Sequence, residues 1–199
     1  MANMTRVGAP KPGGGFYSAD AGAPLPTDAT TALDDAFQLT GLLSNDGLKE
    51  SIDLKTEDIR DWSGANVRTA QSEYSLTLKL TFIERTTNTL KEVFGTDNVT
   101  ETAAQGGGTN RTILYNEKMK PARSYVADMQ DGKNQIRKVY PNAQVTDIGD
   151  IKYIMKDVVS YDVTIKAYKD DAGQFGYEYE FNAATGTSNS KPVVTSPPQ

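Results

Sequence analysis

The alternation of apolar and polar side chains over residues 73–84 constrains the fold more than any other feature of the sequence. Every second residue is apolar and most residues between are polar, which is the period of a strand that is buried on one face. The apolar face holds Tyr74, Leu76, Leu78, Leu80 and Phe82. Such a strand needs neighbouring strands and a second layer that covers its apolar face, so the segment favours a layered β-fold.

Three further segments show the same two-residue period. Residues 158–168 and 177–181 alternate cleanly, and the stretch 169–176 between them predicts a turn, so these two strands are expected to form a hairpin. Residues 48–55 also alternate, although Glu50 interrupts their apolar face. Each strand has one apolar and one polar face, as in an antiparallel sheet with one face in the core and the other in water.

Two turn signals organise the region before the strand at 158–168. The Asp-Gly pair at 131–132 predicts a hairpin made of strands over 122–130 and 133–140. A Pro-Asn pair at 141–142 predicts a second turn, which leads into a strand over 143–149. The region is therefore expected to add three short strands to the sheet.

One short helix is predicted at 87–94, because residues 86–88 can cap its start and Gly95 suits its end. Leu90, Val93 and Phe94 share one face, which must pack on a sheet since a helix of this length is unstable alone. The predicted fold is mainly β: an antiparallel two-sheet sandwich or barrel with one short flanking α-helix.

The distribution of Gly, Ala and Pro divides the chain into three parts. Residues 1–32 are expected to form a flexible N-terminal arm, 33–181 a β-domain and 182–199 a flexible C-terminal tail. Within the domain, 56–72 is predicted to be a long loop that carries the only tryptophan, Trp62. This side chain either folds back onto its own core or anchors a contact outside the domain.

The composition argues against catalysis and metal binding. The chain has no cysteine and no histidine, which removes thiol nucleophiles, the commonest general base and the commonest metal ligand. The glycines at 106–108 lack the Lys-Ser/Thr of a phosphate-binding loop, and the acids at 57–61 have no apolar pocket nearby. No basic run suggests nucleic-acid binding, and no apolar stretch approaches a membrane span. We expect no catalytic residue, no cofactor and no metal.

Six stretches follow one another in a distinctive order and spacing. They are APLPTDATTALDDAF (23–37), IDLKTEDIRDW (52–62), VRTAQSEYSLTLKLTFIE (67–84), TNTLKEVFG (87–95), YPNAQVTDIGD (140–150) and AYKDDAG (167–173). In this string the chain resembles, over roughly residues 20–173, the major tail tube proteins of bacteriophages with long non-contractile tails, especially those that infect actinobacteria. None of the stretches is catalytic, and the likeness lies in their succession.

The resemblance implies a structural protein of the virion, assembled in the host cytoplasm without a membrane. In such proteins two packed β-sheets carry a flanking helix, and six copies join one sheet edge to edge around a lumen. The rings stack through a long loop and the terminal arms. The expected partners are other copies of the chain, the tape measure protein, and the tail tip and terminator proteins. DNA passes through the lumen without specific binding.

The resemblance also assigns roles to residues of this chain. Arg60, Trp62 and Arg68 of the long loop are candidates for contacts between rings or subunits. The polar faces of two strands are candidates for the lumen lining: Lys49, Ser51, Asp53, Lys55, Ser75, Thr77, Lys79 and Thr81. Three of these eight are lysines and only one is acidic. Either the lysines pair with carboxylates, or other strands or faces line the lumen.

Two other functions are compatible with parts of the sequence. An immunoglobulin-like decoration or surface-binding module of a virion would also be a β-sandwich, but it would stay monomeric and carry an aromatic surface patch. An enzyme that uses carboxylates would need a concave pocket with at least two acids of shifted pKa. Polymerisation distinguishes the tube protein from both alternatives.

Overall fold

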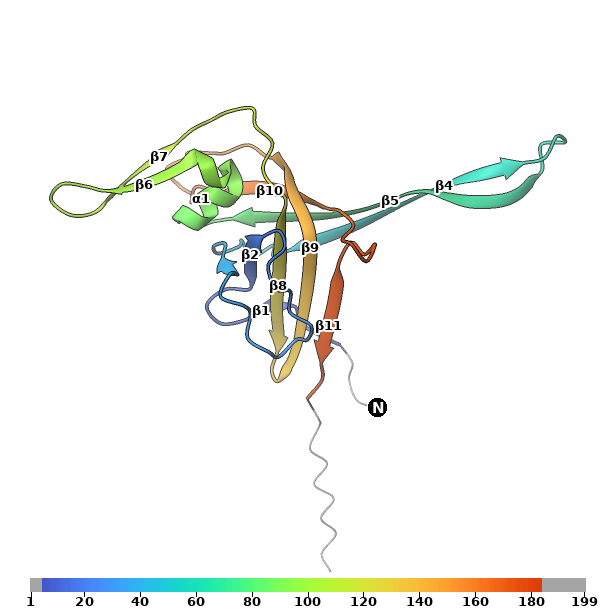
Figure 1. Cartoon of the computed structure of the whole chain (residues 1–199), viewed down its shortest axis with the longest axis horizontal. Helices are drawn as coiled ribbons and strands as arrows, with labels where there is room; N and C mark the ends of the chain where they lie inside the picture. The colour runs from blue at the N-terminus through green and yellow to red at the C-terminus, as the bar shows by residue number, and fades with distance from the viewer. Residues whose placement is uncertain (1–4, 184–199) are drawn as a thin grey trace, which may run out of the picture.

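The computed structural model describes residues 5–183, which form mainly antiparallel strands (Figure 1). Within this range, seven strands of the large sheet follow the order β3-β2-β8-β9-β10-β5-β4, with β1 also paired to β8 and β11 to β9. Strands β6 and β7 form a separate hairpin. The strands are β1 (Ala9–Pro10), β2 (Phe16–Asp20), β3 (Gln38–Leu39), β4 (Lys49–Arg60), β5 (Asn66–Phe82), β6 (Val99–Ala103), β7 (Thr109–Ile113), β8 (Arg123–Asp131), β9 (Asn134–Ile148), β10 (Tyr161–Ala167) and β11 (Tyr177–Phe181).

The long strand β9 belongs to both layers of the sandwich. Its first half, 135–139, pairs with β8 and β11, and its second half, 143–148, pairs with β10. Strands β8, β9 and β11 therefore run across β4, β5 and β10 (Figure 1). The expected turn at 141–142 is wrong. Pro141 lies at a register shift where β9 has more residues than β8, which is a position that tolerates a residue without an N–H group.

The predicted pairing of the last two strands is also wrong. Strand β11 has the bounds that the sequence predicts, but it pairs with β9, whereas β10 lies between β9 and β5. The segment between β10 and β11 thus crosses from one layer to the other. Alternation identifies each strand, whereas the partner depends on which layer has an open edge.

The core lies between the two layers and under the helix. Leu76, Leu78, Leu80 and Phe82 of β5 are buried, as their alternation predicts. Helix α1 (Thr87–Phe94) is confirmed: the Thr86 side chain accepts a hydrogen bond from the Thr89 N–H, and Leu90, Val93 and Phe94 are buried. Burying each large apolar side chain stabilises the fold by about 1.5–3 kcal/mol. The predicted fold class, a mainly β sandwich with one helix, is confirmed.

The expected N-terminal arm differs from the structure at residues 9–20. These residues form β1 and β2, which pair with β8, and Phe16 is only 1% exposed. The strand is short and lies among Gly and Pro residues, which conceal it from composition. The packed body therefore begins near residue 9, not residue 33. Of the expected C-terminal tail, residues 184–199 lie outside the described part of the chain.

The segment 56–72 is not a loop. Strand β4 continues to Arg60 and β5 begins at Asn66, so the segment forms the outer part of a hairpin that projects from the body (Figure 1). Asp61 closes its turn by accepting hydrogen bonds from the N–H groups of Ser63 and Ala65, both 2.9 Å long. Both faces of this ribbon are in solvent, so the apolar alternation that marks a strand is missing.

Candidate functional surfaces

The eight residues predicted to line a lumen lie on one face of β4 and β5. Residues directly opposite each other in neighbouring strands share a face, and the register pairs Lys49 with Lys79 and Ser51 with Thr77. Strand β10 extends the same face, because Asp162 lies opposite Thr81. The face comprises Lys49, Ser51, Asp53 and Lys55 of β4, Glu73, Ser75, Thr77, Lys79 and Thr81 of β5, Asp162, Thr164 and Lys166 of β10, and Gln144 and Asp147 of β9.

Charges on this face, hereafter the polar sheet face, are balanced. Its four lysines are matched by four carboxylates, of which three come from residues that the sequence analysis did not assign to it. The lysine Lys55 pairs with Glu73 at 2.5 Å, which raises the pKa of Lys55 and lowers that of Glu73. Thr81 donates a hydrogen bond to Asp162 at 2.5 Å. The excess of lysines among the eight predicted residues is therefore offset by carboxylates that other positions and strands add to the same face.

The residues of β10 and β9 on this face belong to a recognisable alternating pattern, but their sequence does not show that they lie beside β5. The polar face of β10 alternates as clearly as that of β5, and its Asp162, Thr164 and Lys166 follow the two-residue period. Only the pairing of β10 with β5 places them beside Thr81, Lys79 and Thr77. Asp147 of β9 joins them through its pairing with Thr164.

The three predicted contact residues lie near the end of the β4–β5 hairpin. Trp62 is fully exposed, at 105% of its reference area, so it does not fold back onto its own core. Arg60 donates a hydrogen bond to the Gly64 carbonyl at 3.3 Å across the turn, and Arg68 lies opposite Ile59. The hairpin end therefore presents an aromatic ring and two guanidinium groups to solvent.

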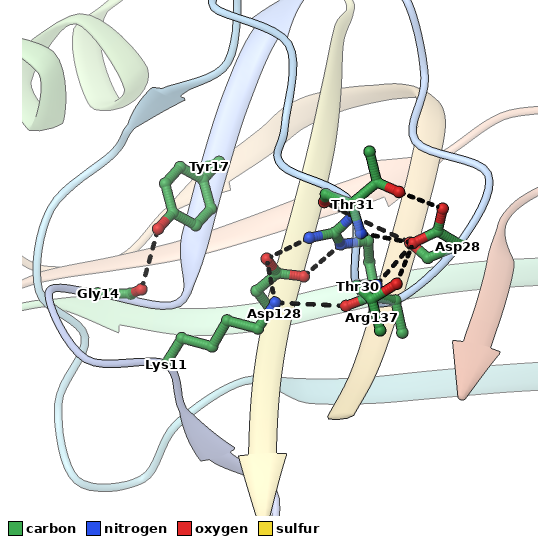
Figure 2. Close-up of polar contacts among 9 residues, drawn as sticks. Lys11, Gly14, Tyr17, Asp28, Thr30, Thr31, Asp128 and Arg137 are labelled. Carbon is green, nitrogen blue, oxygen red and sulfur yellow. Dashed lines mark hydrogen bonds and ion pairs between the residues drawn. The ribbon is translucent and has the colours of Figure 1, made fainter. Parts of the chain in front are cut away.

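A buried ion pair holds the N-terminal segment against the second layer (Figure 2). The guanidinium of Arg137 donates two hydrogen bonds to the Asp128 carboxylate, at 2.5 and 2.8 Å, and two to the carbonyls of Asp28 and Thr31, at 2.9 and 2.8 Å. Lys11 adds a bond of 3.1 Å to Asp128. The pair thus connects β8 and β9 to two separate N-terminal segments.

The segment at residues 28–31 is itself held in a tight turn. The Asp28 carboxylate accepts hydrogen bonds from the hydroxyl and N–H groups of Thr31 and Thr30 (Figure 2). These donors hold the pKa of Asp28 well below its usual range. The turn directs the two carbonyls toward Arg137.

A second buried carboxylate fixes the helix to the sheet. Glu92 of α1 accepts hydrogen bonds from the hydroxyls of Ser18 and Tyr125, the latter at 3.1 Å, and its carboxylate lies 3.4 Å from the Arg123 guanidinium. Burial raises the pKa of Glu92, against the opposing effect of Arg123. Its partners lie on β2 and β8, so the contact orients α1 over the core.

A cleft of about 600 Å³ lies between β4 and β5 of one layer and β9 and β11 of the other. Its walls include Glu50, Lys138 and Glu178, and Lys138 pairs with both carboxylates. Burial opposes the charge of Lys138, but the two carboxylates together raise its pKa. Lys138 therefore stays charged between the two carboxylates, which is not the state of an activated nucleophile.

Neither a metal centre nor a membrane-spanning helix is found in residues 5–183. No group of three or more His, Cys, Asp or Glu side chains in this range is placed to hold a metal ion. No helix in the same range has the length and apolar character needed to cross a membrane.

Comparison with known families assigns the chain. The family described as "Phage tail tube protein" matches residues 9–185, which is most of the sequence. The chain belongs to the phage tail tube protein family. As a tail tube protein it is a structural component of the virion and not an enzyme. A comparison with curated proteins found no match.

Three solved structures resemble the tail tube protein at low identity. The sheath–tube complex of an extracellular contractile injection system in its extended state is 8% identical, with a TM-score of 0.46 over 83% of this chain and 88% of that chain. The tube-terminating cap of the anti-feeding prophage is 11% identical, with a TM-score of 0.44 over 89% and 96%. The sheath/tube terminator of such an injection system is 13% identical, with a TM-score of 0.42 over 86% and 98%.

Proposed function

We propose that six copies of this tail tube protein close into a ring and that stacked rings form the conduit for the phage genome. The observation that carries the proposal is the polar sheet face, which extends without interruption across four strands and has balanced charges. The wall of a lumen needs such a surface, because the wall is in contact with water and must not bind the DNA that passes it.

The physical requirement follows from the charge of DNA, about one negative charge per 1.7 Å of axis. A basic wall would bind it through released counterions, and each neutralised phosphate would add to the friction. On the polar sheet face the ammonium of Lys55 is paired with Glu73, and the four lysines of the face are matched in number by four carboxylates. The face therefore carries no net positive charge that would attract the passing strand.

Ring closure also explains the open edge of the sheet. Among the described residues, β4 pairs only with β5, so its other edge presents unpaired N–H and C=O groups over twelve residues. A long open edge invites uncontrolled aggregation. Pairing it with a neighbouring copy in a closed ring satisfies these groups and ends the growth at a defined number of subunits.

Stacking of the rings is assigned to the projecting hairpin and the chain ends. Arg60, Trp62 and Arg68 lie at the hairpin end, where a neighbouring ring can reach them. Residues before Ala9 and the tail 182–199 would serve as arms that add contacts of low individual affinity. The further partners are the tape measure, tail tip and terminator proteins of a phage with a long non-contractile tail, with an actinobacterial host.

Electron microscopy of the purified protein tests the proposal. After concentration, or after seeding with purified tail tips, uniform hollow tubes with sixfold symmetry in cross-section are expected. A protein that stays monomeric under both conditions would contradict the proposal and favour a surface-binding module. Tubes with a different symmetry would correct the ring number but leave the conduit in place.

A further inference from the structure

Exposed apolar side chains gather in two places that cannot meet within one copy. The first is the end of the β4–β5 hairpin, where Ile59, Trp62 and Val67 are exposed. The second, hereafter the loop patch, lies on the segments that join β7 to β8 and β9 to β10. It comprises Leu114, Tyr115, Met119, Tyr153, Ile154, Met155 and Val158, all of them exposed.

The two segments of the loop patch belong to one surface beside helix α1. Tyr115 packs against Phe94 of α1 with ring centroids 5.0 Å apart, and Phe94 contacts Tyr161 at 6.1 Å. Tyr115 and Tyr153 both act electrostatically on Tyr161, which places the two segments around the same ring. Met155 is nevertheless fully exposed, at 101% of its reference area. Large exposed apolar side chains that gather on one surface mark an interaction site.

The hairpin end and the loop patch lie at opposite ends of the molecule. In Figure 1 the hairpin extends to one side along the longest axis, and α1 with the adjoining segments lies on the other. Strand β10 pairs with β5 only at residues 76–82, so residues 66–75 of β5 pair with β4 alone. At about 3.3 Å per residue this two-stranded ribbon projects roughly 30 Å from the sheet. A ribbon of two strands is marginally stable in water and gains most from a partner surface.

The charges of the two surfaces are complementary in sign. At the hairpin end the carboxylates of Glu57, Asp58 and Asp61 outnumber the two arginines. Hydrogen bonds from Ser63 and from the N–H of Ala65 lower the pKa of Asp61 and keep it charged. The two segments that carry the loop patch, 114–122 and 149–160, have four lysines, Lys118, Lys120, Lys152 and Lys156, against three acids. Within residues 5–183 none of these four lysines takes part in an ion pair, so their charges are available to a partner.

We infer that the loop patch is the receiving surface for the hairpin end of a second copy of this chain in the adjoining ring. The inference rests on the proposed stacked tube and names the partner surface within it. Trp62 supplies the apolar anchor, and Tyr153 and Met155 form the surface on which it packs. Since the two surfaces differ, the contact is head-to-tail and repeats without closing along the tube axis. The acidic side chains beside Trp62 face the lysines of the patch and set its orientation.

Disulfide cross-linking in assembled tubes tests this contact, because the natural chain has no cysteine. The double variant Ala65→Cys/Lys156→Cys places one thiol beside each surface on exposed residues. Mild oxidation of its tubes should give a ladder of covalent multimers that continues beyond six chains. The matched control, Ala65→Cys/Lys133→Cys, replaces a lysine in the exposed β8–β9 turn and should give no ladder.

Each outcome decides the inference. Tubes of the double variant without a ladder would overturn the docking and leave the proposed tube intact. A ladder that stops at six chains would place the contact within a ring and would also overturn it. A chain that forms no tubes, even when seeded, would contradict the proposed function and the docking together.

Substitution provides a second readout that does not depend on thiol geometry. Met155→Ser and Tyr153→Ser change fully or largely exposed side chains, so the monomer should unfold at an unchanged urea concentration. The critical concentration for tube assembly should rise at least tenfold. Leu42→Ser changes an exposed apolar residue outside both surfaces and outside the terminal arms, and it should leave the critical concentration unchanged. Equal effects of the three variants would overturn the inference.

Discussion

Replacing Arg137 with methionine should lower the free energy of unfolding by about 3–5 kcal/mol, the cost of leaving one member of a buried ion pair without its partner. The Arg137 side chain is 2% exposed and that of Asp128 is 5% exposed, so water cannot take over the lost contacts. Four hydrogen bonds disappear at once: two to the carboxylate and one each to the carbonyls of Asp28 and Thr31. Asp128 then has only Lys11 as a cationic partner.

Two further variants separate the pair from its surroundings. Lys11→Met should cost only about 1 kcal/mol, because Lys11 contributes two longer bonds from a partly exposed side chain, 3.1 Å to Asp128 and 3.4 Å to the Ala29 carbonyl. Arg137→Met combined with Asp128→Leu removes both charges, and it should lose about 2 kcal/mol less than Arg137→Met alone. The difference measures the penalty of the uncompensated carboxylate.

Urea unfolding of the unassembled protein, followed by circular dichroism, measures these differences. The slope of the free energy against urea should stay constant, so that the midpoints report stability. Limited proteolysis should also show earlier cleavage near residues 28–31 in Arg137→Met, because that segment loses its attachment. A loss below about 1 kcal/mol for Arg137→Met, or a double variant no more stable than the single one, would refute the reasoning.

Three other perturbations have defined outcomes. Leu78→Ala should destabilise the fold by about 2–5 kcal/mol in the same urea assay, because Leu78 is completely buried. Leu54→Ala on the exposed ribbon should change the free energy of unfolding by no more than about 0.5 kcal/mol. Equal losses would contradict the placement of the core. Burial raises the pKa of Glu92, so the folded state binds more protons than the unfolded one, and stability should fall as pH rises from the ordinary value of 4.5 toward the raised value. Glu92→Gln should remove this slope in thermal unfolding scans, and an unchanged slope would assign it to another group. Asp53→Lys with Glu73→Lys should leave assembly intact but slow the passage of DNA, most strongly at low salt. The control Asp171→Lys with Glu180→Lys adds the same charge at exposed positions outside the polar sheet face and should not slow it. Equal rates would show that the polar sheet face does not line the lumen.

The local elements of the fold could be predicted from the sequence where one face is buried. Leu76, Leu78 and Leu80 mark β5, and Leu90 with Val93 marks α1, because burial on one side imposes a period. The outer ribbon of β4 and β5 has water on both faces, and nothing in its sequence separates it from a loop. Phe16 was hidden for a different reason: a strand of five residues among glycines gives too few positions for a period to show.

The candidate surfaces could be predicted only in part. The alternation in β4 and β5 gave the eight polar residues, but the balancing acids Asp147 and Asp162 belong to strands that are distant in sequence. Pairing between distant strands depends on the whole sheet, so local patterns do not contain it. The loop patch was missed because residues 114–119 and 149–160 have no period, and their apolar side chains stand out only once their exposure is known.

The strand order also determines when a newly made chain can complete its fold. Strand β5 can pair with β4 as soon as both are synthesised, because the two are adjacent in sequence. The other edge of β5 pairs with β10, which is synthesised much later. Strand β2 likewise pairs with the later strand β8. Contacts between such distant segments slow folding, and the unfinished sheet exposes Leu76 and Leu78 in the meantime. Residues 161–167 therefore complete the sheet late in folding, after the apolar face of β5 has been left uncovered.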